Sequence, residues 1–166
     1  MLFRSGGGRR PVLHAVSKIP ELHCVLIGDG PYHEELKRLA DELGIAERCE
    51  FMRSVANEVL CRTLKDYDIL ISVNDVGGVS KVDLEAAHVG LPVITNAHHI
   101  ERQPEVLEEN CLVVEATPAA YEAALRRLLA DESLRAHLGS DLRRSVAHLR
   151  GERSEAAYVS VYRSLL

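Results

Sequence analysis

The sequence predicts an α/β fold, a Rossmann-like parallel sheet flanked by helices, on three observations. Short apolar runs bounded by glycine, proline or polar residues alternate with helical periodicities over residues 12–114. Strands separated by helices imply right-handed crossovers and a parallel sheet that is covered on both faces. The whole chain, residues 1–166, has the length of one domain, and residues 118–166 form a helical tail without further strand patterns.

The elements are justified in order by their patterns. A short helix is expected after Pro11. In the next helix, apolar residues recur at helical spacing, and Gly44 ends it; these residues are Leu36, Leu39, Ala40 and Leu43. The expected strands cover residues 23–27, 48–52, 69–73, 92–95 and 111–114, and the expected helices cover 12–18, 32–43, 57–64 and 80–88. Two helical stretches follow Pro118, and Gly151 separates them from a last one near the C-terminus.

Composition excludes several classes of protein. A net charge of −5 and 4% aromatic residues argue against a general nucleic-acid binder. Basic residues late in the chain are interleaved with acidic ones, which favours a solvated helix face over peripheral contact with a membrane. Four cysteines stand singly in the sequence, without metal-ligand spacing, and indicate core residues in a reducing compartment. With no signal pattern and no membrane span, we expect a cytoplasmic protein.

Residues 68–95 have the pattern strand, glycine loop, helix, strand. The amides of Gly78, Val79 and Ser80 are expected at the helix start, where unpaired N–H groups attract phosphate. Glu85 is expected further along that helix, in a position to bind a ribose diol. The alternative at this point is a helix-capping turn followed by a glutamate that faces solvent.

The order of several motifs resembles the C-terminal, donor-binding domain of GT-B glycosyltransferases of the retaining family 4 type. The matching segments begin with Val25-Leu26-Ile27-Gly28-Asp29-Gly30-Pro31, continue with Leu43-Gly44-Ile45-Ala46-Glu47-Arg48, and include Leu84-Glu85-Ala86-Ala87 followed by Gly90-Leu91-Pro92-Val93-Ile94-Thr95. The similarity covers roughly 150 residues, and the motifs occur in the same order as in that family. It implies one half of a GT-B fold.

The resemblance implies a nucleotide-diphosphate-sugar as substrate, with a UDP-sugar or a GDP-sugar as the expected donor and with no separate cofactor. Glu85 matches the second of the family's two glutamates, whereas the first falls on Gly77, so Asp75 and Asn74 are the candidates to replace it. Relatives bind the diphosphate with an Arg and a Lys near the start of this domain. In this sequence Arg9 and Arg10 are the candidates for that role, and Arg4 lies near them in the sequence. The full expected donor-binding set is Gly28, Gly30, Arg53, Ser54, Val55, Gly77, Gly78, Val79, Ser80 and Glu85.

No metal site is expected, because His98, His99 and Glu101 lie in one loop without a further ligand. Relatives of this fold carry the acceptor on a separate N-terminal half, which is expected here in cis or as a partner subunit, and this chain by itself should bind better than it catalyses. Two other hypotheses remain. One is a non-catalytic glycosyltransferase-like module for protein interaction or sugar recognition, and the less favoured one is a sugar-nucleotide epimerase.

Overall fold

The computed structural model describes residues 2–4, 9–73, 80–96 and 109–147. Within them the strands are β1 (Leu2–Arg4), β2 (Cys24–Ile27), β3 (Cys49–Met52), β4 (Leu70–Ser72), β5 (Val93–Asn96) and β6 (Leu112–Val114). The helices are α1 (Arg10–Ser17), α2 (His33–Glu42), α3 (Asn57–Thr63), α4 (Lys81–Val89), α5 (Pro118–Ala130) and α6 (Glu132–Ser145). Two 3-10 turns, η2 (Ala46–Arg48) and η3 (Leu64–Asp66), connect neighbouring elements.

All the strand pairs described are parallel, in the order β3-β2-β1-β4-β5-β6. This confirms the predicted Rossmann-like fold, and the predicted strands agree with the structure to within one residue at each end. The chain builds outward from β1 in one direction through β2 and β3, and in the other through β4, β5 and β6. The sheet therefore has its topological switch point between β1 and β4, where ligands bind in sheets of this kind.

The central strand, β1, is absent from the elements that the sequence predicts. β1 covers only three residues at the very start of the sequence, before a glycine run, so no apolar run with turn residues on both sides marks it as a strand. Pairing on both sides, with β2 and with β4, holds this segment in the sheet. Tertiary pairing thus decides a strand that local pattern cannot.

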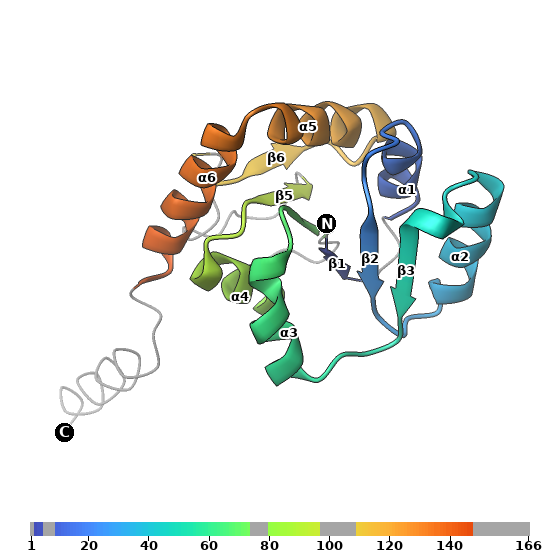
Figure 1. The fold of residues 1–166 in the computed structure, drawn as a ribbon, viewed down its shortest axis with the longest axis horizontal. Coiled ribbons are helices and arrows are strands. Elements are labelled where there is room, and N and C mark those ends of the chain that lie inside the picture. The colour runs from blue at the N-terminus through green and yellow to red at the C-terminus, as the bar shows by residue number, and fades with distance from the viewer. Residues whose placement is uncertain (1, 5–8, 74–79, 97–108, 148–166) are drawn as a thin grey trace, which may run out of the picture.

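Helices cover both faces of the sheet (Figure 1): α1, α2 and α5 lie on one face, and α3 and α4 lie on the other, where α6 packs on α4. The first layer buries Leu13 of α1 and Tyr121 and Leu125 of α5 at 1% exposure or less. On the opposite face Val82 and Ala86 of α4 pack in one cluster with Leu142 of α6. Each large apolar side chain buried in this way contributes about 1.5–3 kcal/mol.

A glycine turn ends α2 where the sequence predicts, and side-chain caps begin α5 and α6. Gly44, at φ +68°, follows α2, and the Gly44 N–H donates to the Asp41 carbonyl at 3.0 Å. Thr117 and Asp131 cap α5 and α6 through side-chain oxygens. The expected last helix, at residues 157–165, lies outside the described residues. None of the described helices is long and apolar enough to cross a membrane.

The cysteines differ from the expectation of single core residues. Cys24 and Cys111 are buried, but Cys61 is exposed on α3. Cys24 and Cys49 are register partners on β2 and β3, and their Sγ atoms are 3.1 Å apart. The pairing of the two strands brings together two thiols that the sequence separates by 25 residues.

Candidate functional site

The expected donor-binding residues follow the carboxyl ends of the strands, so the parallel sheet brings their segments to one edge. Gly28 follows β2, Arg53 follows β3, and Ser80 precedes α4 after the loop that leaves β4. Asn74, Asp75, Gly77, Gly78 and Val79 lie outside the described residues, as do His98, His99 and Glu101. The predicted catalytic candidate Asp75 and the missing first glutamate are therefore not placed.

The Gly28–Gly30 loop is held by its neighbours on β3 and α2. The Gly28 N–H donates to the Met52 carbonyl at 2.8 Å. The Gly28 carbonyl lies 2.7 Å from Nδ1 of His33, whose ring is buried and packs edge-on against Phe51. His33 is thus one of the residues that hold this loop, a role that no sequence pattern indicates.

Arg53 is already engaged with two carboxylates. Its guanidinium forms ion pairs with Asp29 of the Gly28–Gly30 loop and, at 2.9 Å, with Glu34 of α2. Ser54 is exposed and Val55 is half-buried next to it. A phosphate would have to compete with these two acids for Arg53.

The two arginines expected to bind phosphate have different surroundings. Arg10 is exposed, and its guanidinium forms an ion pair with Glu35 of the neighbouring helix α2. Arg9 directly precedes α1, at the end of the connection from β1, and is only 4% exposed. The position after β1 lies at the switch point, and Arg9 is thus the better placed of the two.

The start of α4 corrects the expectation for Ser80. Ser80 forms a capping box with Asp83: the Ser80 N–H donates to Asp83 Oδ2 at 3.0 Å, and the Asp83 N–H donates to Ser80 Oγ at 3.3 Å. The expectation that the Ser80 amide is unpaired was wrong, because a carboxylate of the same helix takes it. The alternative of a helix-capping turn is confirmed at Ser80, and the S-x-x-D spacing of the sequence is the signal for it.

Glu85 occupies a partly buried position one turn beyond the start of α4. Its side chain is 14% exposed, and its Oε1 atom is buried with no hydrogen-bond partner among the described residues. Lys81 Nζ lies 3.5 Å from that oxygen and donates a hydrogen bond of 2.7 Å to Asn57 Oδ1 of α3. Glu85 is thus an acceptor oriented by a cation, and the sequence analysis missed both Lys81 and Asn57.

A pocket of about 440 Å³ lies between α3 and α4 next to this pair of charges. It is lined by Cys61, Lys81, Leu84, Glu85, His88 and Val89. Its volume falls in the range of about 300–1,000 Å³ that is typical of small-molecule sites. The wall of the pocket is mainly apolar, and Lys81 and Glu85 lie at one end of it. Such a pocket suits a ligand that is apolar over most of its surface and carries hydroxyl groups at one end.

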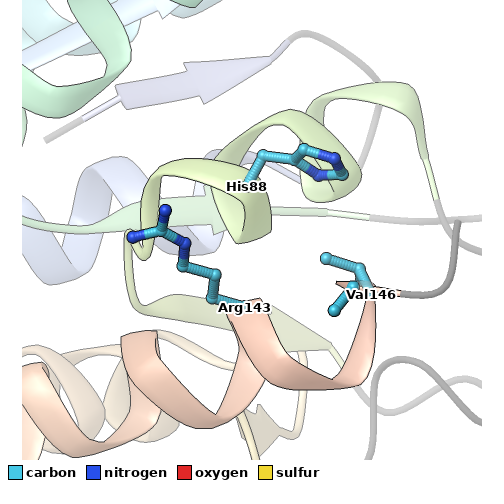
Figure 2. A pocket seen from close by; sticks show the side chains of 4 residues that line it. His88, Arg143 and Val146 are labelled. Atoms are coloured by element: carbon cyan, nitrogen blue, oxygen red, sulfur yellow. The ribbon is translucent and has the colours of Figure 1, made fainter. Parts of the chain in front are cut away.

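A second hollow lies at the far end of α4, between α4 and α6. Figure 2 shows His88 on α4 beside Arg143 and Val146 of the α6 segment, which line it together with Ala147. Its volume is about 10 Å³, which is room for about one water molecule. Among the residues that the structure describes, no cluster of three His, Cys, Asp or Glu side chains is close enough to hold a metal ion.

Comparison with known proteins identifies the family that this chain resembles. Residues 10–144 match the family described as "Glycosyl transferases group 1". A mannosyltransferase of Mycolicibacterium smegmatis, named as GDP-mannose-dependent alpha-(1-6)-phosphatidylinositol monomannoside mannosyltransferase, is 30% identical over 130 residues, which are 74% of this chain and 34% of the relative. The chain spans less than half the length of that relative.

Solved structures share the fold at lower identity. Sucrose-phosphate synthase from Thermosynechococcus elongatus superposes with a TM-score of 0.84 at 23% identity, covering 99% of this chain and 45% of that one. Anabaena Alr3699/HepE, solved in complex with UDP, superposes with a TM-score of 0.75 at 15% identity, covering 97% of this chain and 48% of that one. Both likenesses establish the fold.

Proposed function

The chain belongs to the group 1 glycosyl transferases, and from this premise we propose that it is the donor-binding domain of an enzyme that moves a sugar from a nucleotide diphosphate to an acceptor. The observation that carries the proposal is Glu85. Its carboxylate is largely withdrawn from solvent, has an oxygen without a hydrogen bond from the described residues, and lines a pocket large enough for a ligand. A buried acceptor oxygen that lacks a hydrogen bond gains most from a ligand hydroxyl, and a ribose diol supplies two.

The proposed chemistry is departure of a nucleoside diphosphate from the anomeric carbon. The bond from the anomeric carbon to the phosphate oxygen breaks, an acceptor oxygen forms the new bond to that carbon, and the acceptor's proton passes to the departing diphosphate or to water. Negative charge grows on the departing diphosphate, so a cation close to it lowers the barrier. Arg9, buried beside the switch point, is the described residue best placed for that task. Retention of the anomeric configuration and a role for Asp75 are part of this proposal.

The acceptor belongs to another half of the assembly. The mannosyltransferase of Mycolicibacterium smegmatis is about three times as long as the segment it shares with this chain. We propose that an N-terminal acceptor-binding half completes the site, either in the same polypeptide or as a partner subunit. The isolated chain is then expected to bind nucleotide without transferring sugar.

A second candidate function has its own support. Gly77 stands where the family has its first glutamate, and the Asp83 carboxylate occupies the Ser80 amide at the start of α4. Both features would weaken binding of a donor, and they have no cost in a module that no longer binds one. In that case the chain serves in protein interaction or sugar recognition, and the pocket beside Glu85 has no nucleotide to hold.

Calorimetric titration of the folded chain with UDP, GDP, ADP and dTDP separates the two. We expect one diphosphate to bind and Glu85→Gln to weaken it by about tenfold or more, which is about 1.4 kcal/mol. Glu122→Gln is the matched control, since Glu122 pairs with Arg126 four residues along α5 just as Glu85 pairs with Lys81. Absence of binding at millimolar ligand, or equal binding by Glu85→Gln, overturns the donor-site proposal.

A further inference from the structure

Resting on the proposed function, we propose that Asp83 limits the affinity of the site for the diphosphate, because its buried carboxylate occupies the start of α4. Asp83 is 5% exposed. Its Oδ2 atom holds the Ser80 N–H at 3.0 Å, and its Oδ1 atom is buried without a hydrogen bond from the described residues. The start of a helix is otherwise a favourable position for a phosphate.

The carboxylate acts on an incoming anion in two ways. It accepts the amide hydrogen of Ser80, so that this N–H cannot point at a phosphate oxygen. It also carries a negative charge out of solvent, where Coulomb repulsion is less screened than in water. Both effects oppose binding of a diphosphate and neither acts on an uncharged nucleoside.

The neighbouring cation does not offset this charge. Lys81 lies 3.5 Å from Glu85 and donates to Asn57, so its ammonium is directed toward α3. Among the described residues none forms an ion pair with Asp83. The first two turns of α4 therefore carry one carboxylate paired with a cation, Glu85, and one carboxylate with no cationic partner among the described residues, Asp83.

The capping box also stabilises α4, and a purely structural role predicts the opposite response to substitution. If Asp83 only caps the helix, any change to it loosens α4 and leaves nucleotide binding unchanged or weaker. If Asp83 repels the diphosphate, removing its charge tightens binding even when the helix becomes less stable. The sign of the change in affinity thus separates the two roles.

Asp83→Asn is the decisive variant, because asparagine keeps the size of the side chain and an oxygen for the Ser80 N–H. Titration with the diphosphate that binds the unsubstituted chain should show a dissociation constant lower by about tenfold, as expected for removal of a poorly screened like charge. The corresponding nucleoside, which lacks phosphate, should bind both proteins equally. Thermal unfolding in the same buffer should show a midpoint equal to or below that of the unsubstituted chain.

Asp131→Asn is the matched control. Asp131 is the N-cap residue of α6 and accepts the Leu134 N–H at 2.9 Å, so this variant removes a capping carboxylate of the same charge from the start of another helix. We expect its diphosphate affinity to be unchanged. A tightening in Asp131→Asn as large as in Asp83→Asn would attribute the effect to net charge and overturn the inference.

The remaining outcomes are also decisive. Unchanged or weaker diphosphate binding by Asp83→Asn, in a sample where Glu85→Gln abolishes binding, overturns the role of Asp83 and leaves the donor site standing. Equal tightening of nucleoside and diphosphate also overturns it, since the charge then does not act on phosphate. Failure of both the unsubstituted chain and Asp83→Asn to bind any of the diphosphates overturns the proposed function and this inference together.

Discussion

Gly139 of α6 meets Gly90 at the end of α4 so closely that a Cβ atom on Gly139 would lie 1.9 Å from the Gly90 carbonyl oxygen. Gly90 itself has a φ of +76° and ends α4 by donating its N–H to the Ala87 carbonyl at 3.1 Å. The helix that carries Glu85 is thus fixed at its far end by backbone contact with α6. Any side chain at position 139 has to push the two helices apart.

We predict that Gly139→Ala destabilises the chain by about 2 kcal/mol, the usual effect of forcing extra volume into a packed interface. Chemical unfolding in urea measures the change. Gly44→Ala is the comparison, because Gly44 has a φ of +68° but no atom within 4 Å of its Cβ position. Its cost is backbone strain alone, about 1 kcal/mol. Equal stability of Gly139→Ala and the unsubstituted chain would contradict the contact.

Much of the fold is predictable from local pattern, and its exceptions have physical causes. Alternating apolar runs and helical periods locate β2 to β6 to within one residue, since each of these strands lies in an apolar run with polar or turn residues on both sides. β1 is not predicted from the sequence, because its strand conformation depends on pairing with β2 and β4. The contact between Cys24 and Cys49 depends likewise on strand register, which no local pattern contains.

The candidate site divides in the same way. Glu85 is predictable from its motif, and the capping box of Ser80 and Asp83 follows from a spacing of three residues. The contact of Lys81 with Asn57 joins residues 24 positions apart, and it exists only because α3 packs beside α4. Ion pairs of Arg53 with Asp29 and Glu34 also cross between elements. Sequence supplies the residue types, and packing decides their partners.

Lys81→Met should weaken binding of the diphosphate by about threefold. The Lys81–Glu85 pair has one exposed partner, and such pairs contribute about 0.2–1 kcal/mol. Without the ammonium, the Glu85 carboxylate loses its orientation and repels the incoming phosphates. Titration at low and high salt measures the effect, which should shrink as salt rises. Lys65→Met, in η3, is the control, and an equal loss in both variants would argue against a specific role for Lys81.

The cap of α6 makes stability depend on pH in the acid range. The Ser133 hydroxyl, and after it the Leu134 N–H, stabilise the ionised form and hold the pKa of Asp131 below its usual 3.8. A lowered folded-state pKa gives stability that is present above the ordinary pKa and is lost as pH falls through the folded value. We therefore expect Asp131→Ala to unfold at a lower temperature than the unsubstituted chain at pH 7, and the difference to vanish at the acid end. A constant difference across that range would refute the linkage.

Cys24 and Cys49 are placed to form a disulfide under oxidising conditions. Neighbouring strands are about 4.8 Å apart, which falls within the Cα separation of about 4.4–6.8 Å that disulfides span. The hydrogen bond with Cys24, followed by the charge of Arg48, lowers the pKa of the Cys49 thiol. The same contact, followed by burial, raises the pKa of Cys24. Cys49 is also the less buried of the two, so it reacts first.

We predict that oxidised glutathione converts this pair into an intramolecular disulfide. The Cys49 thiolate attacks glutathione disulfide and releases one glutathione thiolate, and Cys24 then displaces the second as the thiol loses its proton. Mass spectrometry of tryptic peptides should recover residues 24 and 49 cross-linked, whereas exposed Cys61 retains a glutathione adduct. Closing this loop should raise stability by about 3 kcal/mol, and Cys49→Ser should abolish the gain. A mixed disulfide that persists on Cys49 beside a reduced Cys24 would show that the two strands do not hold the thiols in contact.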